Sequence, residues 1–234
     1  FLGYHKSTPL YKQFKSITPT EWIFDSGTIS SAFPITNTSS KIDAFTIDED
    51  LVSLSENFNV AGKLSPFQNT GVFISGQVHT TKTLPIFDGK RTVLSDILEK
   101  SIIPDEFYIA EDEYEKWEYL KGSKKEIRTA KTGYSYNYSE GSMVFPDALD
   151  NASRTIITGE GGKSPSRFKH VVQTKKGLRR LTPLELERLN MFPDNHTSLE
   201  GISDTKRAFF MGNALVVGVV QKIATVLADK ISKT

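Results

Sequence analysis

The stretch RRLTPLELERLNMFPD, residues 179–194, decides the fold expected of the C-terminal part of this chain. Thr182 is followed by a proline in the first turn and by Glu185 three residues on, which together form a capping box at the start of a helix. Leu181 and Leu186 flank the cap as a hydrophobic staple. The Phe-Pro-Asp sequence that closes the stretch is expected to end the helix, because proline cannot continue it.

Two more helices are expected after this one. A short helix should run from Ser203 to about Phe210 and stop at Gly212. Asn213 is then expected to cap a longer helix that runs to about Lys230. The first two turns of the longer helix are apolar on nearly every side, so this part of the helix needs burial on more than one face. That need indicates a missing partner.

Composition narrows the class of protein. The chain has 234 residues, 38% hydrophobic and 11% aromatic, which is enough for a real core. Its mean hydropathy of -0.32, without an uninterrupted apolar stretch of about 20 residues, argues against a membrane protein. It contains no cysteine, which excludes disulfides, thiolate zinc sites and a cysteine nucleophile from this chain. The histidines lack metal-ligand spacing, so no metal site is expected. No export signal is visible, so a cytoplasmic protein is expected.

Charge is unevenly distributed along the chain. Residues 96–118 carry nine acids against two bases, whereas residues 151–180 carry eight bases against one acid. The basic run is interleaved with Gly, Ser and Thr, which let backbone N–H groups approach phosphates or bases. A solvated basic loop without a ligand is the alternative, but the small residues favour nucleic acid.

The remaining elements are less sharply defined. Residues 13–80 are rich in Ser, Thr and Asn and predict loops and short strands, such as one over Val72–Ile74. Residues 92–99 have the apolar spacing of a helix of about two turns. Residues 1–4 resemble the end of a strand, which indicates a fragment or a processed piece.

Two further strands are expected in the middle of the chain. Tyr134, Tyr136 and Tyr138 alternate along one of them and share a face. Packing against another layer is the favoured reason for these tyrosines, and stacking on DNA the less favoured one. Residues 154–158 predict the other strand.

The order of the motifs resembles one enzyme family. Residues 179–194 closely resemble the ninth conserved motif of DNA cytosine-5 methyltransferases, and GNALVV at 212–217 resembles the tenth. Residues 154–158, with the glycines after them, look like the part of the family's target recognition domain that carries a Thr-aliphatic pair. Residues 1–5 look like the tail of the strand that ends the eighth motif. The resemblance is strong over residues 151–225 and weaker before them.

Several family motifs are absent from this sequence. The resemblance implies a Pro-Cys nucleophile, a Glu-Asn-Val segment, an Arg-x-Arg pair and a Phe-x-Gly-x-Gly loop for S-adenosylmethionine, and none of them occurs here. Cytosine is not nucleophilic enough at C5 until a thiolate adds at C6. We therefore expect no catalytic residue in this chain and no methyl transfer by it alone.

The expected fold class is α+β. A small, mixed, β-rich target recognition domain is followed by a C-terminal helical segment that would pack on a missing Rossmann-like catalytic domain. The expected divisions are the tail of a catalytic-domain strand at 1–12, the target recognition domain at 13–178 and the helices of the ninth and tenth motifs at 179–234.

Site residues follow from the resemblance and from the basic run. Thr155 and Ile156 match the family's pair near the flipped base, and Arg179 matches an arginine that anchors the recognition domain. Asn213 and Ala214 match residues that approach the methionine end of S-adenosylmethionine. The full set of expected DNA-binding residues is Arg154, Thr155, Ile156, Gly161, Gly162, Lys163, Ser164, Ser166, Arg167, Lys169, His170 and Arg179.

The resemblance implies the C-terminal half of a methyltransferase from a restriction-modification system, of bacterial or phage origin. Its partners would be double-stranded DNA and an N-terminal half carrying the Pro-Cys nucleophile, with S-adenosylmethionine bound mainly by that half and no membrane involved. The target cytosine would be flipped out of the duplex. The alternatives are a non-catalytic, sequence-specific DNA-binding module and an unrelated interaction protein whose acidic and basic halves pair with each other.

Overall fold

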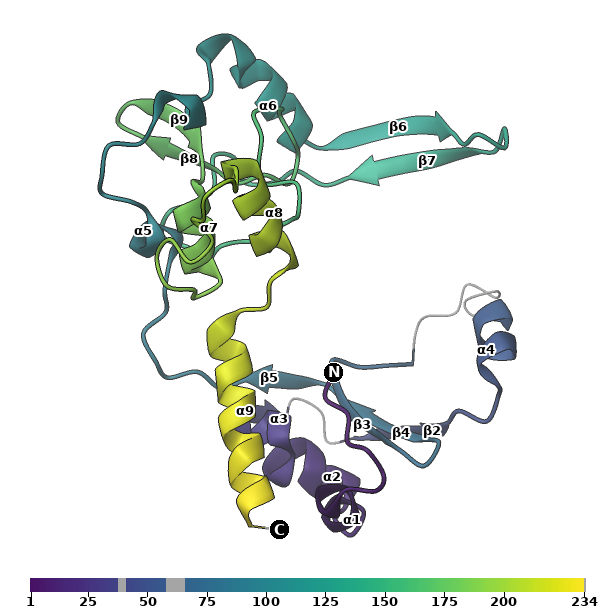
Figure 1. The fold of residues 1–234 in the computed structure, drawn as a ribbon. Coiled ribbons are helices and arrows are strands. Elements are labelled where there is room, and N and C mark those ends of the chain that lie inside the picture. The colour runs from purple at the N-terminus through teal and green to yellow at the C-terminus, as the bar shows by residue number, and fades with distance from the viewer. Residues whose placement is uncertain (38–40, 58–65, 234) are drawn as a thin grey trace. The chain divides into compact units, whose positions relative to one another are not determined.

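The computed structural model describes residues 1–37, 41–57 and 66–233 (Figure 1). The chain forms two compact units, one of Phe1–Gly89 with Gln221–Thr234 and one of Lys90–Val220. The division expected after residue 178 instead falls inside a strand of the second unit. Strand β9 (Gly177–Arg180) pairs there with β8 (Val171–Thr174), and this ladder holds the two sides of the expected boundary together.

Short helices dominate the start of the first unit, where loops and strands are expected from the sequence. Thr8 and Thr18 each cap a helix that begins with proline, accepting from the backbone N–H of Tyr11 and Glu21 respectively. These Thr-Pro pairs are the sequence signal for the two helices. The helical elements are α1 (Pro9–Phe14), α2 (Pro19–Glu21), the π-helix η1 (Trp22–Ser26), α3 (Thr28–Ala32) and α4 (Leu51–Asn57).

The strands of the first unit form two small antiparallel sheets. One pairs β1 with β5, and the other has the order β2-β4-β3. The predicted strand over Val72–Ile74 is confirmed as part of β3. The strands are β1 (Ile35–Asn37), β2 (Asp43–Thr46), β3 (Thr70–Ile74), β4 (Gln77–Thr81) and β5 (Thr83–Pro85).

Aromatic rings pack the helices of the first unit together. Phe14 makes an edge contact with Trp22, their ring centroids 3.9 Å apart, and Tyr4 donates a 2.7 Å hydrogen bond to Thr28. The expected strand end at residues 1–4 is wrong, because these residues are assigned to no strand. An apolar groove of about 780 Å³ remains beside the rings, and the exposed Ile29 lines it with Phe73.

The second unit contains two hydrophobic clusters. One cluster joins Leu94, Val172 and Leu186, and the other joins Trp117, Val171 and their neighbours. The elements around them are α5 (Leu94–Ile97), the 3-10 helices η2 (Asp105–Phe107) and η3 (Glu111–Glu113), α6 (Tyr114–Lys121), β6 (Lys124–Thr129), β7 (Ser135–Glu140), β8, β9, α7 (Pro183–Leu189), α8 (Asp204–Asn213) and the start of α9 (Val217–Ser232).

The capping box at the start of α7 is confirmed. Thr182 Oγ1 accepts from the N–H of Glu185 at 3.2 Å, and Glu185 Oε2 accepts from the N–H of Thr182 at 2.9 Å. The helix ends before the Phe-Pro sequence, because Asn190 leaves the helical conformation and Met191 has a φ of 60°. The side chain of Asn190 donates to the carbonyl of Met211 at 2.8 Å and so ties α7 to α8.

The last two helices are shifted relative to the prediction. Ser203 caps α8 as expected, but Gly212 does not stop it and the helix ends at Asn213. Asn213 is therefore the last residue of α8 rather than the cap of α9, and α9 begins at Val217 instead of Ala214.

One described stretch, Asp204–Ser232, is long and apolar enough to cross a membrane by length and composition alone. The stretch is interrupted between α8 and α9, and its residues Ala208 and Met211 are buried in the core of the second unit. Only 6% of its apolar window is buried, and α9 contains no buried residue. The absence of a membrane partner stays a prediction.

Strands β6 and β7 form a two-stranded hairpin that extends from the end of α6 (Figure 1). The strand expected around the tyrosines is confirmed, but their packing against another layer is wrong, since the side chains of Tyr134 and Tyr136 are 70% and 40% exposed. The strand expected over residues 154–158 is wrong too, because that segment is an irregular loop.

Candidate nucleic-acid interface

The basic run of residues 151–180 turns most of its charge inward. Six of its eight bases bind carboxylates or backbone carbonyls of the second unit. Lys163 and Lys175 are exposed and make no such contact within the described residues. Most cations of this run therefore stabilise the protein itself instead of forming a free basic surface. The loop of residues 153–170, which several of them hold in place, is called the recognition loop below.

Asp147 anchors the start of the recognition loop. Its carboxylate accepts from Arg154 at 2.7 Å and 3.1 Å and from the backbone N–H of Val171 at 2.8 Å. Burial raises the pKa of Asp147, but the hydrogen bonds from Arg154 and Val171 outweigh it and hold this pKa below the usual range. Arg154 also donates to the carbonyls of Phe168 and Lys169, so its guanidinium closes the loop upon itself.

His170 is enclosed and pairs with Glu160. Its side chain is fully buried, with Nδ1 at 2.8 Å from Glu160 Oε1 and Nε2 at 3.0 Å from the hydroxyl of Ser153. The backbone N–H of His170 donates to the other carboxylate oxygen of Glu160 at 3.0 Å. The expected role of His170 as a DNA contact is thus replaced by an internal one, because every polar atom of its ring is occupied.

Lys169 is also buried, and its ammonium binds backbone carbonyls within the recognition loop. Its ammonium donates to the carbonyls of Gly162 at 3.0 Å and Ser164 at 2.8 Å. Arg180 donates to the carbonyl of Gly162 as well, at 2.8 Å, which the left-handed φ of 81° at Gly162 makes possible. Burial lowers the pKa of Lys169, and the nearby Arg180 lowers it further. Lys169 and Gly162 therefore shape the turn rather than offer donors to a duplex.

Lys121, at the end of α6, belongs to the same buried network. Its ammonium donates to the carbonyls of Arg167 at 3.2 Å and Lys169 at 2.5 Å, and its side chain is 1% exposed. Burial lowers its pKa to about 8. Sequence reasoning misses this residue, because a lysine in the last turn of a helix is usually solvated.

Arg167 joins the recognition loop to the base of the hairpin. Its guanidinium donates to the carbonyls of Leu120 at 3.1 Å and Gly122 at 3.0 Å, bonds the carbonyl of Gly141, and lies 3.3 Å from the carboxylate of Glu140. These contacts occupy the guanidinium N–H donors of Arg167, which the sequence analysis expects to bind DNA.

Arg179 is the most deeply buried cation of the run. Its guanidinium is 2% exposed and forms two hydrogen bonds, of 2.7 Å and 2.6 Å, to the carboxylate of Glu185. Glu185 also caps α7, so this pair links β9 to the start of that helix. This burial leaves Arg179 no direct access to DNA, and the anchoring role implied by the resemblance stays a prediction.

Two glycines bring the recognition loop against α8. A Cβ at Gly161 would lie 2.8 Å from Cα of Thr205, and a Cβ at Gly212 would lie 2.4 Å from the backbone of Thr158. Both clashes are with backbone, which cannot move aside cheaply. Gly161 is therefore required for packing and not, as the sequence suggests, for the approach of a nucleic acid.

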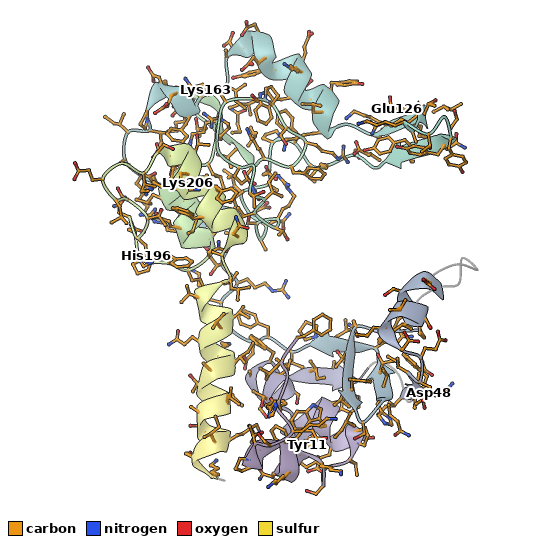
Figure 2. All side chains as sticks on the ribbon, turned by 45° about the vertical axis from the view of Figure 1, so that its right-hand side comes forward. Tyr11, Asp48, Glu126, Lys163, His196 and Lys206 are labelled. Carbon is orange, nitrogen blue, oxygen red and sulfur yellow. The ribbon has the colours of Figure 1, made fainter. Side chains whose placement is uncertain are left out.

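The outer surface of the loop is mostly polar, apart from the half-exposed Phe168. Thr155, Lys163 and Ser164 are exposed, whereas Ile156 packs against the core and Ser166 accepts from the N–H of Phe168. Figure 2 labels Lys163 on this loop. Of the residues expected to bind DNA, these exposed ones are the ones that the structure leaves accessible.

The residues expected near the methyl donor follow the end of α8. Asn213 is exposed, and its amide donates to the carbonyl of Phe209 at 2.9 Å. Ala214 adopts an extended conformation that ends the helix. The side-chain oxygen of Asn213 accepts no hydrogen bond from the described residues, so it remains available to a ligand.

The sequence profile of the C-5 cytosine-specific DNA methylase family matches residues 57–229, more than half of the chain. The chain belongs to this family. Among curated members it is similar to the type II methyltransferase M.Sau3AI of Staphylococcus aureus, with 36% identity over 223 residues that make up 94% of this chain and 52% of the relative. The type II methyltransferase M.NlaX of Neisseria lactamica is 28% identical over 140 residues, which are 58% of this chain and 39% of that protein.

Solved methyltransferase structures show a partial likeness to this family member. The Dnmt2 methyltransferase of S. pombe matches with a TM-score of 0.43 and 14% identity, over 67% of this chain and 51% of its own. The methyltransferase EhMeth of Entamoeba histolytica matches with a TM-score of 0.44 and 14% identity, over 82% and 54%. The chain spans about half the length of M.Sau3AI and less of M.NlaX.

Proposed function

We propose that this chain is the DNA-recognition half of a DNA cytosine-5 methyltransferase of a restriction-modification system. It would hold a specific duplex site while a partner half methylates a flipped cytosine with S-adenosylmethionine. The observation that carries the proposal is membership of a cytosine-specific DNA methylase family combined with the absence of cysteine from all 234 residues. Without a thiolate to add at C6, the chain alone is inactive.

The recognition loop supports the DNA-binding part of the proposal. Buried ion pairs fix its backbone, so Thr155, Lys163 and Ser164 are presented on a rigid frame. A rigid frame lowers the entropy cost of binding, and hydroxyl and ammonium groups are donors for phosphates and base edges. Lys163 is the residue of this loop that we assign to phosphate contact.

The first unit supports the partner part of the proposal. Its groove, lined by the exposed side chains of Ile29 and Phe73, is an apolar surface that no described residue of the first unit covers. We assign this surface to the catalytic half that carries the Pro-Cys nucleophile, since this chain spans only 52% of M.Sau3AI. Such a half would have a Rossmann-like fold, as the resemblance implies.

S-adenosylmethionine supplies the methyl group when it is bound. The residues of this chain that would approach it are Asn213 and Ala214, and the free side-chain oxygen of Asn213 fits a hydrogen-bond donor such as an ammonium group. The partner half would provide most of its binding site. The bacterial sources of M.Sau3AI and M.NlaX support a cytoplasmic location in a bacterium or its phage.

Reconstitution tests the proposal. The purified chain is mixed with the separately expressed N-terminal half of M.Sau3AI, and transfer of a labelled methyl group from S-adenosylmethionine to duplex DNA is measured. Transfer is expected only when both halves are present. Transfer by this chain alone would contradict the proposal.

A matched variant separates docking from DNA binding. Phe73→Ser, on the exposed apolar surface, should reduce the reconstituted transfer and leave duplex binding by this chain unchanged. If the wild-type chain binds duplex DNA but no N-terminal half restores transfer, the non-catalytic DNA-binding module becomes the better description.

A further inference from the structure

The two faces of the β6–β7 hairpin differ in whether their side chains form ion pairs and hydrogen bonds with one another. Residues that pair directly across the ladder share a face, so one face carries Lys124, Glu126 and Arg128 opposite Glu140, Tyr138 and Tyr136. The other face carries Lys125, Ile127 and Thr129 opposite Ser139, Asn137 and Ser135. We call them the tyrosine face and the polar face (Figure 2 labels Glu126 on the hairpin).

The tyrosine face satisfies its own polar groups. Arg128 lies 3.4 Å above the ring of Tyr138 and donates to Glu126 at 2.8 Å. The hydroxyl of Tyr138 bonds Glu140, which also lies 3.6 Å from the ammonium of Lys124. Its two cations and two carboxylates therefore balance. An isolated two-stranded hairpin is marginally stable, so these contacts serve to stiffen it.

The tyrosines extend this stiffening toward the turn. The rings of Tyr134 and Tyr136 stack with centroids 6.5 Å apart and planes 10° from parallel. The turn closes with a hydrogen bond from the N–H of Ala130 to the carbonyl of Tyr134 at 2.8 Å, and Gly133 adopts a left-handed φ of 84°. The hairpin is thus an ordered arm along its whole length.

The polar face has the opposite character. Lys125, Asn137 and Ser139 are exposed and form no ion pair or side-chain hydrogen bond with a described residue. Lys131, in the turn, is equally free, and the polar face carries no acid. Ile127 is 75% exposed between these groups. A face with one free cation, a second free cation in the adjoining turn, uncommitted amide and hydroxyl groups and one exposed apolar side chain is complementary to a polyanion with hydrogen-bonding edges.

We propose that the β6–β7 hairpin is a second DNA-contacting arm, which enters the major groove with its polar face toward the bases. This inference rests on the proposed function and adds a contact surface separate from the recognition loop. The major groove is about 12 Å wide and admits a two-stranded β-ribbon. Lys125 and Lys131 bind phosphates, while Asn137 and Ile127 meet base edges, where an amide can pair with adenine and an aliphatic group with the thymine methyl.

Two variants of the full chain test the arm. Lys125→Ala/Lys131→Ala removes two phosphate contacts, so the slope of the logarithm of the binding constant against the logarithm of salt concentration should decrease by about two. Asn137→Ala should leave that slope unchanged and weaken the sequence preference selected from a randomised duplex pool. Binding is measured by fluorescence anisotropy with a labelled duplex.

The control variant Lys100→Ala/Lys116→Ala removes the same charge from exposed positions of the acidic stretch 96–118. It should keep the wild-type slope, and circular dichroism should show the same folding for all variants. A wild-type slope in the hairpin double variant would overturn the arm and leave the proposed function standing. Failure of the wild-type chain to bind any duplex would overturn both.

Discussion

The recognition loop and the β6–β7 hairpin are both rich in lysine and arginine, yet they use these side chains in opposite ways. In the loop, Arg154, Arg167 and Lys169 face inward and bind carboxylates or carbonyls. In the hairpin, Lys125 and Lys131 face solvent and bind nothing within the described residues. The count of charges along a sequence therefore does not reveal which of them a ligand can reach.

The difference has a physical cause in the backbone. An irregular loop has carbonyls without ladder partners, and a buried carbonyl without a donor is costly. Cations of the loop satisfy these carbonyls, as Lys169 does for Gly162 and Ser164. The hairpin satisfies its carbonyls in its own ladder, so Lys125 and Lys131 remain free, whereas Lys124 and Arg128 pair with carboxylates of the tyrosine face.

The largest expected effect is on the buried pair Arg179–Glu185. Arg179→Ala leaves the carboxylate of Glu185 buried without its charge partner, which should lower the free energy of unfolding by about 3–5 kcal/mol. Urea denaturation followed by circular dichroism measures this loss. Lys175→Ala, at an exposed position in the turn between β8 and β9, is the control and should change stability by less than about 0.5 kcal/mol. Equal losses in the two variants would refute the inward assignment of Arg179.

The next effect concerns the contact between the recognition loop and α8. Gly161→Ala forces a Cβ against the backbone of Thr205 and should cost about 1–3 kcal/mol of stability. Gly159→Ala is the matched control, because its Cβ would meet only the end of the Ile157 side chain, at an ordinary 3.4 Å. Thermal unfolding of both variants decides the point, and an equally stable Gly161→Ala chain would contradict the close packing.

A pH effect is expected from Lys121, whose pKa burial lowers to about 8. Between pH 8 and the ordinary lysine pKa near 10.5, the unfolded chain binds more protons at this position than the folded chain, so stability rises with pH. Below pH 8 both states are protonated and this dependence disappears.

The free energy of unfolding of the wild-type chain should therefore rise by roughly 2–3 kcal/mol from about pH 8 to pH 10.5. Lys121→Met should not show this rise. Urea denaturation over that range measures the rise. Lys116→Met, on an exposed position of the same helix, should keep it. If Lys121→Met keeps the wild-type pH profile, the ammonium of Lys121 in the wild-type chain is better solvated than its 1% exposure indicates.

The smallest effect is expected in the hairpin. Tyr134→Ser removes one ring of the stacked pair but uncovers no core, so global stability should change by less than about 0.5 kcal/mol. Amide hydrogen exchange of residues 124–140 should nevertheless become faster, because the stack orders the arm locally. A large global loss would show that the hairpin packs on the rest of the second unit.

Part of this architecture could be predicted from local sequence alone. The capping box of Thr182 and Glu185, the cap at Ser203 and the strand over Val72–Ile74 depend on neighbours in the chain, so their patterns predict them correctly. The Thr-Pro caps of α1 and α2 were equally local signals.

The site could be predicted only in outline. Its segment is found by resemblance, but the directions of its side chains depend on groups far away in sequence. Asp147 orients Arg154, and the carbonyls that hold Arg167 come from residues at least 26 positions earlier. Lys121 was missed for the same reason, because nothing near it in sequence indicates the carbonyls that it binds.

The contact of Gly161 and Gly212 with opposing backbone also limits how this protein can diversify. Inserting or deleting a residue between positions 157 and 161 would force α8 out of its place, since both ends of that segment lie against the helix. Substitutions at the exposed side chains of this segment are therefore expected to cost less stability than changes of its length. At the hairpin turn of residues 130–133, by contrast, a Cβ at Gly133 would meet no atom within 4 Å, so a change of length is expected to disturb the fold least there.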